Sequence, residues 1–258
     1  MNLLPVPALA DNYVWLLHDS NDAIVVDPGE AAPVLRALEA HHLRAAAILV
    51  THHHADHCGG VRALHEATSV PIFAPAGERL PFDGLPVQPV RGGDTFEALG
   101  LRWRVLDVPG HTVGHIAFFT DDVDGAPLLF CGDALFCGGC GRIFEGTPAQ
   151  MLASLDALAA LPGSTRVCAA HEYTLANLRF AQLVEPDNTA LAQHLAHCEQ
   201  LRAQGHPTLP STIALEQAIN PFLRSRCPTV IQSVRAHSGC TDDEVAVFAA
   251  LREWKNQA

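Results

Sequence analysis

The stretch Thr51-His52-His53-His54-Ala55-Asp56-His57 decides how this sequence is interpreted. It follows the apolar run Ala46–Val50, which predicts a buried strand, and it precedes a helical pattern. Residues two apart in an extended chain point to the same side, so we expect His52, His54 and Asp56 to converge if the strand ends in an extended loop. His57 would then face a second centre. Imidazole and carboxylate groups suit zinc, iron or manganese, with zinc first. A histidine-rich surface loop would share this composition, but the position between a buried strand and a helix disfavours it.

Three further sites place similar side chains just after a predicted strand. His111 follows the strand that ends at Val108, and Asp133 and His171 each follow another predicted strand. Ligand sites in α/β folds gather at the carboxyl ends of strands. Each site alone is a weak signal, because an Asp after Gly is more often a turn. Together the four strand ends supply five histidines and two aspartates, and this set predicts a metal site.

Composition and charge exclude several classes of protein. With 48% hydrophobic residues among 258, the chain is too apolar for intrinsic disorder, and its formal charge of −12 argues against a nucleic-acid partner. No apolar run reaches the roughly 18 residues of a membrane span. The apolar start Leu3–Ala10 lacks a basic leader and is interrupted by two prolines, so we expect a cytoplasmic protein rather than a secreted one. The 8 cysteines should then be free thiols.

The secondary-structure pattern changes after residue 172. Before it, apolar and β-branched runs alternate with helical patterns; after it, helices follow without a credible strand between them. We therefore predict an α/β domain at 1–172 and a helical domain at 173–258. The predicted strands are Tyr13–Leu17, Ile24–Val26, Ala46–Val50, Pro71–Ala74, Arg102–Val108, His115–Thr120, Pro127–Cys131 and Arg166–Ala170. The predicted helices are Ala31–Ala40, Val61–Ala67, Met151–Leu161, Leu175–Val184, Asn188–Ala203 and Asp242–Trp254.

Taken together, these motifs resemble the metallo-β-lactamase superfamily. Thr-His-x-His-x-Asp-His, Gly-His-Thr-x-Gly-His at 110–115, the Gly-Asp pair and the late histidine carry that resemblance. More narrowly, Gly139–Gly146, His171–Thr174 and Asn220–Arg224 resemble glyoxalase II, the hydroxyacylglutathione hydrolase family. The resemblance runs from Asp11 to the C-terminus. It implies an α/β fold, the αββα sandwich, with a C-terminal helical domain.

The resemblance also implies a dinuclear metal centre. One of two divalent ions would be bound by His52, His54 and His111, and the other by Asp56, His57 and His171, with Asp133 shared. Zinc is the first choice of metal, with iron or manganese as alternatives. Two such ions hold a hydroxide that attacks the thioester carbonyl, and Asp56 and Asp133 are the catalytic carboxylates around it. His53 and His115 belong to the motifs as supporting or packing residues.

The implied activity is hydrolysis of S-(2-hydroxyacyl)glutathione thioesters, S-D-lactoylglutathione giving D-lactate and glutathione in methylglyoxal detoxification. Glutathione carries two carboxylates, which guanidinium groups bind in a bidentate fashion. Some relatives have Tyr where Phe144 stands, and eukaryotic relatives place a lysine shortly after the Asn-Pro-Phe segment, so how the glycine carboxylate is held stays open. The substrate-binding residues that the resemblance implies are Arg142, Phe144, His171, Tyr173, Arg224 and Arg226.

Two other functions stay open at this point. A persulfide dioxygenase of the same superfamily would use a single iron at His52, His54, His111 and Asp133, and the complete second ligand set argues against it. A non-catalytic binder of metal or thiol ligands is the other alternative. We expect a monomer whose partner is the glutathione thioester, with no nucleic-acid or membrane partner.

Overall fold

The computed structural model describes residues 1–240 and 243–258, and the chain divides into two compact units. Unit 1 comprises Met1–Asp107, Val113–Gly132 and Cys168–His171. Unit 2 comprises Val108–Thr112, Asp133–Val167 and Glu172–Ala258. The chain therefore passes between the units several times. The domain boundary predicted at 172/173 stays a prediction, because the two compact units are each built from several separate segments of the chain.

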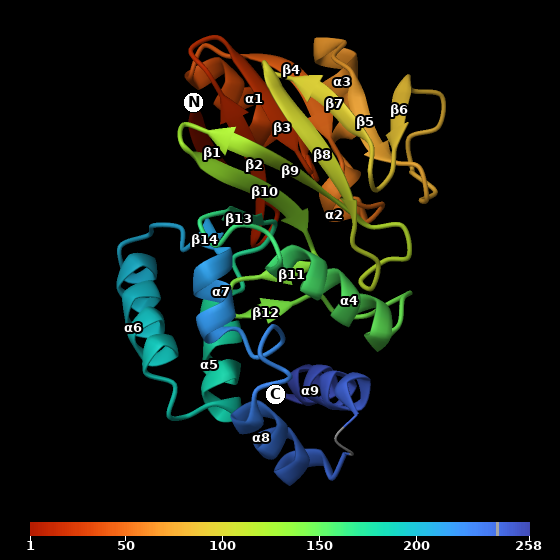
Figure 1. The fold of residues 1–258 in the computed structure, drawn as a ribbon. Helices are drawn as coiled ribbons and strands as arrows, with labels where there is room; N and C mark the ends of the chain where they lie inside the picture. The colour runs from red at the N-terminus through yellow and green to blue at the C-terminus, as the bar shows by residue number, and fades with distance from the viewer. Residues whose placement is uncertain (241–242) are drawn as a thin grey trace. The chain divides into compact units, whose positions relative to one another are not determined.

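The first sheet of unit 1 has six strands in the order β1-β2-β3-β4-β5-β6 (Figure 1). Its first three strands are antiparallel and the rest run parallel, which is the arrangement that α/β crossovers produce. The strands are β1 (Asn2–Ala8), β2 (Asn12–His18), β3 (Asp22–Val26), β4 (Arg44–Leu49), β5 (Ile72–Pro75) and β6 (Val87–Val90). Unit 1 also contains the helices α1 (Ala31–Ala40), α2 (Ala55–Cys58) and α3 (Val61–Thr68).

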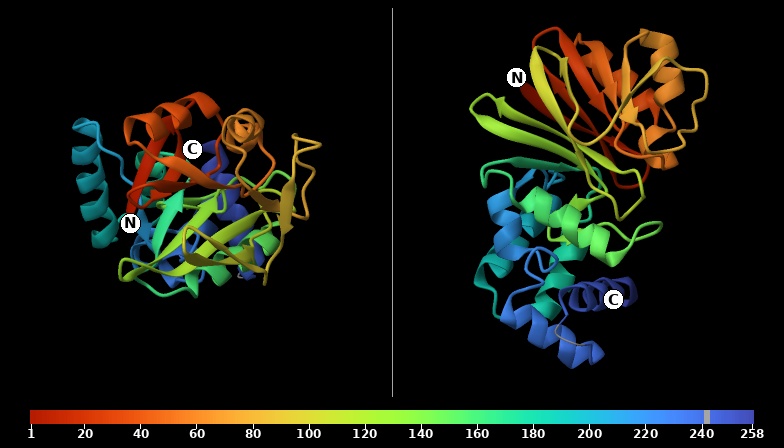
Figure 2. Two further views of the ribbon diagram at one scale, coloured as in Figure 1. Left: turned by 90° about the horizontal axis from the view of Figure 1, so that it is seen from above. Right: turned by 45° about the vertical axis from the view of Figure 1, so that its right-hand side comes forward.

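The second sheet of unit 1 is antiparallel from β7 to β10, and the end of β13 lies beside β10. Its strands are β7 (Thr95–Ala98), β8 (Leu101–Asp107), β9 (Ile116–Val123), β10 (Ala126–Gly132) and β13 (Arg166–Ala169). The two sheets form separate layers in both views of Figure 2. Phe96 of the second sheet stacks on Phe73 of the first, with ring centroids 4.0 Å apart. Side chains from both sheets thus meet in one core.

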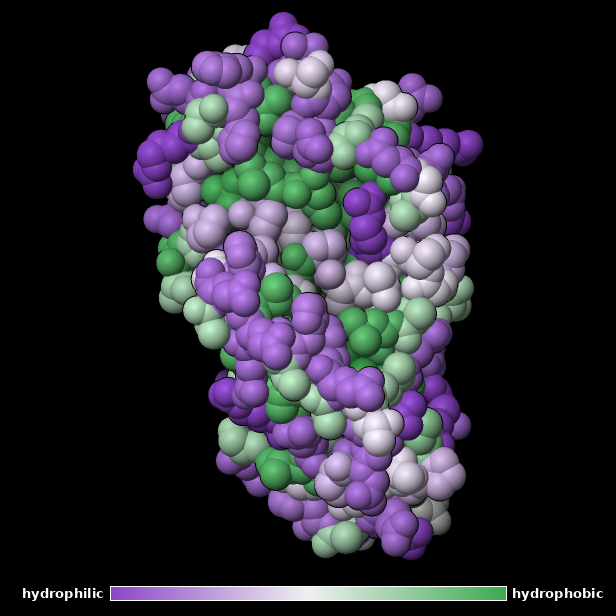
Figure 3. All heavy atoms as spheres, turned by 90° about the vertical axis from the view of Figure 1, so that its left-hand side faces the viewer, coloured by the Kyte–Doolittle hydropathy of each residue, from purple (hydrophilic) through white to green (hydrophobic). Residues whose placement is uncertain are grey.

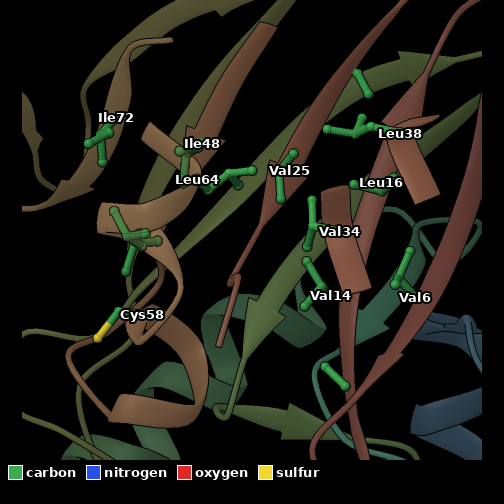
Figure 4. Packing of buried hydrophobic residues seen from close by; sticks show 14 of the residues in the cluster. Val6, Val14, Leu16, Val25, Val34, Leu38, Ile48, Cys58, Leu64 and Ile72 are labelled. Atoms are coloured by element: carbon green, nitrogen blue, oxygen red, sulfur yellow. The ribbon is translucent and has the colours of Figure 1, made fainter. Parts of the chain in front are cut away.

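The outer face of the first sheet is covered by α1 and α3. Val34 of α1 and Leu64 of α3 lie in one buried cluster with Val25 and Ile48 of the sheet (Figure 4). Because β2 has helices on one side and the second sheet on the other, six of its seven residues are buried. These layers fix the carboxyl ends of the parallel strands, where the metal-ligand candidates begin.

Unit 2 is mostly helical, as expected for the last third of the chain. Its helices are α4 (Pro148–Ala159), α5 (Thr174–Val184), α6 (Thr189–Ala203), α7 (Ile213–Ile219), α8 (Pro228–Ser238) and α9 (Glu244–Gln257). A two-stranded hairpin, β11 (Leu135–Phe136) and β12 (Gly139–Cys140), lies in the same unit. The short strand β14 (Ser211–Thr212) pairs with the first residues of β13. On the face drawn in Figure 3, hydrophilic side chains predominate and hydrophobic ones lie in patches between them.

The predicted elements are confirmed, and the structure adds several that the sequence pattern did not predict. The helix predicted to begin at Asp242 appears as α9 from Glu244, while Asp242 itself lies outside the described residues. The expectation of no strand after residue 172 was wrong at β14, which consists of only two residues. The elements not predicted are β1, β6, β7, β11, β12, β14, α2, α7 and α8. Most are four residues or shorter, or contain prolines that obscure the pattern.

None of the helices in residues 1–240 and 243–258 combines the length and apolar character that crossing a bilayer requires. All eight cysteines are free thiols in the structure, and six of them are buried.

Candidate metal centre and binding pocket

The metal-ligand candidates of unit 1 begin where β4 ends. Thr51 is buried there, and its backbone N–H and hydroxyl both donate to the carboxylate of Asp27, at 2.7 and 2.8 Å. Asp27 lies in the turn after β3, the neighbouring parallel strand. The start of the His-x-His stretch is therefore fixed by the adjacent strand end rather than by its own sequence.

The extended geometry predicted for His52, His54 and Asp56 holds only as far as His54. His54 is extended, but α2 begins at Ala55, so Asp56 lies in a first helical turn. A carboxylate is favoured at this position because it faces the positive end of the helix dipole. The prediction that Asp56 converges with His52 and His54 by strand alternation was therefore wrong. Asp56 instead groups with His57 and His171, with one ligand atom of each within 4.8 Å of the others.

The Asp56 carboxylate lies between two imidazole rings. Its Oδ2 is 3.4 Å from the Nε2 of His57 and 3.4 Å from the Nε2 of His171. Burial alone would raise the pKa of Asp56, but hydrogen bonds from His171 and His57 outweigh it and hold that pKa well below its usual range. Asp56 is therefore a carboxylate at every physiological pH, which suits a metal ligand and not a proton donor.

The other ring nitrogen of each of these histidines is held by a carboxylate. His57 Nδ1 lies 3.1 Å from Asp27 Oδ2, and His171 Nδ1 lies 2.8 Å from Asp11 Oδ1. A carboxylate at Nδ1 holds a proton on that nitrogen, so Nε2 is the nitrogen that would release its proton and bind a metal. Both rings are thus oriented with Nε2 toward Asp56.

Asn12 connects the first sheet to this group. Its side-chain N–H donates to Asp56 Oδ2 at 3.1 Å and lies 3.4 Å from His171 Nε2. An isolated β-bridge joins Asn12 to His171, and the Tyr13 N–H donates to the Ala170 carbonyl at 2.7 Å. The end of β13 is therefore aligned beside the start of β2, which brings His171 to Asp56 across about 115 residues of sequence.

His52 and His54 form the second imidazole group of unit 1. His52 Nδ1 lies 3.0 Å from the Thr51 hydroxyl, and His52 Nε2 lies 3.1 Å from His54 Nδ1. The buried ring of His115 stacks on His52 at a centroid distance of 4.6 Å. Position 132 beside Thr51 requires glycine. A Cβ there would lie 2.3 Å from the Thr51 hydroxyl oxygen, and the φ angle of +48° is one that other residues rarely adopt.

Unit 2 brings together the two remaining candidates, His111 and Asp133. His111 Nε2 lies 3.4 Å from Asp133 Oδ2, and its Nδ1 lies 2.7 Å from the Arg142 carbonyl oxygen. The same orientation recurs here, with Nδ1 on an oxygen acceptor and Nε2 toward a carboxylate. Asp133 directly follows β10, and both residues are buried.

The donor set fits divalent metal ions. Buried imidazoles with oriented Nε2 atoms beside acceptor-only carboxylates form the nitrogen and oxygen environment that zinc, iron and manganese share. His57, His171 and His111 each have Nδ1 against an oxygen acceptor, as metal-bound histidines almost always do. Asp56, His57 and His171 are therefore suited to a metal ion within unit 1, and His111 and Asp133 are two further donors of the same kind in unit 2.

A pocket of about 370 Å³ lies in unit 2 next to His111 and Asp133. Of the residues predicted to bind substrate, Arg142, Phe144 and Tyr173 line it. Phe144 and Tyr173 are exposed, so their aromatic rings are accessible to a ligand. The other lining residues are Phe136, Cys140, Ala176, Asn177, Arg252, Lys255 and Asn256.

The pocket is cationic, although the whole chain is acidic. Arg142, Arg252 and Lys255 all line it, and only Arg142 was predicted from the sequence. Arg252 is buried, donates to the Cys140 carbonyl at 2.7 Å and lies over the Phe222 ring. Burial lowers the pKa of Lys255, and the charge of Arg252 lowers it further. An anion bound between these cations would relieve that repulsion.

The structure places Arg224 and Arg226 away from this pocket, in ion pairs. Arg224 binds the Glu185 carboxylate through two nitrogens, at 2.7 and 3.0 Å. Arg226 binds Asp156 and Glu244. Neither arginine is among the residues that line the pocket, and Arg224 lines a separate groove beside α8.

Five residues of these sites were not predicted from the sequence: Asp11, Asn12, Asp27, Arg252 and Lys255. Asp27 could have been predicted, because it directly follows the predicted strand Ile24–Val26, just as the other candidates follow predicted strands. Arg252 and Lys255 are three positions apart on α9 and therefore share a face, but the predicted helix ended at Trp254, and the sequence does not show which residues that face contacts.

Two family models together match residues 9–258. The model described as "Metallo-beta-lactamase superfamily" matches residues 9–171, and the one described as "Hydroxyacylglutathione hydrolase C-terminus" matches residues 172–258. The first alone covers more than half of the chain. The expected α/β fold of this superfamily, with its C-terminal helical region, is thereby confirmed.

Proteins named for one activity are similar to this chain over its whole length. The hydroxyacylglutathione hydrolase of Albidiferax ferrireducens is 60% identical over 257 residues, which is 100% of both chains. That of Cupriavidus taiwanensis is 57% identical, covering 98% of this chain and 97% of its own. Among solved structures, TTHA1623 in a di-iron-bound form is 29% identical with a TM-score of 0.60, covering 85% of this chain and 99% of that one. The chain belongs to the metallo-beta-lactamase superfamily and, within it, to the hydroxyacylglutathione hydrolases.

Proposed function

We propose that this protein hydrolyses S-(2-hydroxyacyl)glutathione thioesters, with S-D-lactoylglutathione as the substrate and D-lactate and glutathione as the products. The observation that carries the proposal is the unit 2 pocket, where His111 and Asp133 share a wall with Arg142, Arg252 and Lys255. A cationic pocket beside metal-ligand candidates suits a substrate that has carboxylates at one end and a reactive carbonyl at the other. The names of the full-length relatives support the same reaction.

The proposal includes two metal ions for each chain, with zinc as the first choice. One ion is assigned to His52, His54 and His111, the other to Asp56, His57 and His171, and Asp133 is assigned to both. When bound, such ions supply Lewis acidity and deprotonated water near neutral pH. The di-iron form of TTHA1623 supports a two-metal centre and keeps iron as an alternative.

The chain's own residues bind and orient the thioester. Arg142, Arg252 and Lys255 are assigned to the glutathione carboxylates, since guanidinium and ammonium groups hold carboxylates by charge-assisted hydrogen bonds. Phe144 and Tyr173 flank the peptide. Asp133 Oδ2 lies near His111 at the end of the pocket assigned to the thioester.

No general acid is needed at the leaving group. A thiol has a reference pKa of about 8.5, so glutathione leaves as a thiolate without prior protonation. Asp56, whose pKa is held low, is assigned to metal binding and to orienting His57 and His171. Asp56 and Asp133 are therefore the carboxylates on which the reaction depends.

The test is thioester hydrolysis by metal-loaded protein. We expect loss of S-D-lactoylglutathione absorbance together with one free thiol for each thioester consumed, abolished by a chelator and restored by zinc. Two bound ions without turnover would reject the proposal. Oxygen uptake with one bound iron would support the dioxygenase alternative, and ligand binding without any reaction would support the non-catalytic one.

The remaining proposals concern organisation and location. We propose a monomer in the cytoplasm, with a catalytic domain at 1–172 and a substrate-binding domain at 173–258. Light scattering on the metal-loaded protein tests the first of these, because a mass of twice 27.6 kDa would contradict a monomer.

A further inference from the structure

The hairpin that borders the pocket depends on support from outside itself. We define the pocket hairpin as Asp133–Arg142, which contains β11, β12 and the turn between them. Its ends lie against each other, since the Gly141 N–H donates to the Ala134 carbonyl at 3.2 Å. It carries Asp133 at one end and Arg142 at the other, both lining the pocket. An isolated two-stranded hairpin is marginally stable in water, so neighbouring elements must hold it.

Two buried side chains from α7 and its C-terminus hold the middle of the hairpin. Glu216 Oε2 accepts the Gly138 N–H at 2.9 Å. The Asn220 side-chain N–H group donates to the Phe136 and Gly139 carbonyls, at 3.1 and 2.9 Å. Backbone groups on both strands and in the turn are thus bound by two side chains.

Glu216 and Asn220 also fix each other. Asn220 Nδ2 donates to Glu216 Oε2 at 3.0 Å, and Asn220 Oδ1 accepts the Phe222 N–H at 3.0 Å. Both side chains are fully buried, where a hydrogen bond is stronger than in water and losing one leaves a buried polar group unsatisfied. The turn packs closely against α5, because a Cβ at Gly138 would lie 2.7 Å from the Leu178 side chain.

Neither side chain lines the pocket, so any effect on substrate is indirect, and the hydrogen bonds of Glu216 and Asn220 to the hairpin backbone provide a route for it. We propose that Glu216 and Asn220 are positioning residues, which set the place of Arg142 for the glutathione part of the substrate through the pocket hairpin. The inference rests on the proposed thioester hydrolysis. It assigns a role to Asn220 of the Asn-Pro-Phe-Leu-Arg segment that differs from direct substrate binding.

Glu216 offers a conservative variant that separates positioning from the mere presence of a charge. Burial raises the pKa of Glu216, against the lowering effect of the hydrogen bonds that it accepts. Gln has the same shape and keeps an acceptor oxygen for Gly138 and Asn220. Glu216→Gln should therefore preserve the hairpin, whereas Glu216→Ala should release it.

The first experiment compares steady-state kinetics of metal-loaded variants with S-D-lactoylglutathione. For Glu216→Ala and Asn220→Ala we expect KM to rise about tenfold with kcat within about threefold, since removing binding that is uniform along the reaction raises KM alone. Asp133 lies before the residues that Glu216 and Asn220 bind, which is why kcat should change less. Glu216→Gln should return KM to within about twofold of wild type.

Gln217→Ala is the matched control. Gln217 lies on the same helix and donates to the Ala159 carbonyl at 2.9 Å, away from the hairpin. Its removal costs one side-chain hydrogen bond of the same element, so a general loosening of α7 would appear in this variant too. Equal KM changes in Gln217→Ala and Glu216→Ala would overturn the proposal.

The second experiment does not depend on turnover. Amide hydrogen exchange of the 133–142 peptide should speed up in Glu216→Ala and stay at the wild-type rate in Glu216→Gln and Gln217→Ala. Calorimetry with S-methylglutathione should show about tenfold weaker binding for Glu216→Ala. Faster exchange with unchanged KM and unchanged binding would reject positioning. A wild-type protein that binds S-methylglutathione but has no turnover would reject the proposed function alone.

Discussion

Three of the metal-ligand candidate histidines, two in unit 1 and one in unit 2, have the same ring orientation. His57, His171 and His111 each have Nδ1 against an oxygen acceptor and Nε2 toward a carboxylate. The acceptors differ, being two aspartates and a backbone carbonyl, and they come from three separate parts of the sequence. The sequence motifs therefore identify the candidate histidines, and residues from other parts of the chain orient their rings.

Removing one of these acceptors should weaken metal binding without removing a ligand. For Asp11→Ala we expect about 10–100-fold lower affinity for zinc, because His171 loses the group that fixes its tautomer and ring orientation. Competition with a fluorescent chelator measures the affinity. Asp22→Ala is the control, since Asp22 pairs with Arg44 on the exposed surface. Unchanged zinc affinity in Asp11→Ala would contradict this orienting role.

The cations of the pocket should act on substrate binding. For Lys255→Met we expect KM to rise about tenfold with kcat nearly unchanged, because a hydrogen bond to a charged group contributes about 1.5–3 kcal/mol. Arg179→Met removes a cation that pairs with Glu199 elsewhere on the surface, and it should leave KM unchanged. A lower kcat with the same KM in Lys255→Met would place this residue in the reaction rather than in binding.

The motifs identified residues that the structure brings close together, but they did not identify residues whose role depends on what surrounds them in the fold. His52, His54, His111 and His171 were predicted as metal ligands because they follow predicted strands, at whose carboxyl ends the ligand sites of α/β folds gather. Lys255 looks like any solvated lysine on a helix, and its place in a pocket becomes visible only with the structure. Arg224 shows the converse, because its motif drew attention while the structure gives it Glu185 as partner.

At the scale of elements, strand ends were predictable and the start of a short helix was not. Apolar runs such as Ala46–Val50 give strands directly, since they are buried on both faces. The four residues of α2 are too few for a helical period, so the chain after His54 was expected to stay extended. That one-turn helix places Asp56 beside His57 and His171 rather than beside His52 and His54. Every residue of the motif was nevertheless identified from the sequence.

The ion pair between Arg224 and Glu185 joins the segment after α7 to the end of α5. For Arg224→Met we expect a loss of about 2 kcal/mol in stability at pH 7 with unchanged KM, a value reduced from that of a fully buried pair because Arg224 is partly exposed to water. Thermal unfolding and steady-state kinetics measure the two effects. A raised KM with an unchanged melting temperature would contradict this prediction and support the role of Arg224 in substrate binding that the resemblance implies.

The same pair predicts a pH dependence. Burial would raise the pKa of Glu185, but hydrogen bonds from Arg224 and Thr229 outweigh it, so the folded-state pKa lies below the ordinary 4.5. The stabilisation is therefore complete above pH 4.5 and is lost as the pH falls through the folded value. The difference in melting temperature between wild type and Arg224→Met should narrow below that pH. A constant difference from pH 7 down to pH 3 would contradict it.

At the scale of the whole molecule, composition and pattern predicted the class of fold, and the motifs predicted the family. The layers follow from apolar strands that need cover on both faces, which is why unit 1 matched its expected elements. The division into compact units does not follow the sequence, because the chain leaves unit 1 at Val108 and again at Asp133. Where the chain leaves and re-enters a unit depends on contacts between residues far apart in sequence, which local sequence patterns do not predict.

Metal loading should be visible in global stability. A ligand that binds only the native state stabilises it by RT ln(1 + [L]/Kd), so zinc in hundredfold excess over Kd adds about 2.7 kcal/mol. We expect the melting temperature of apo-protein to rise on adding zinc until two ions are bound for each chain, as elemental analysis counts them. Saturation at one ion would contradict the assignment of Asp133 to a shared position.

The carboxyl terminus has a practical consequence through α9. That helix ends at Gln257, one residue before the last, and Arg252, Lys255 and Asn256 lie on its final turns. A purification tag fused after Ala258 would begin about one helical turn from the residues assigned to glutathione. Kinetic work should use a cleavable tag at the opposite end, and any truncation series should treat the last seven residues as part of the binding surface.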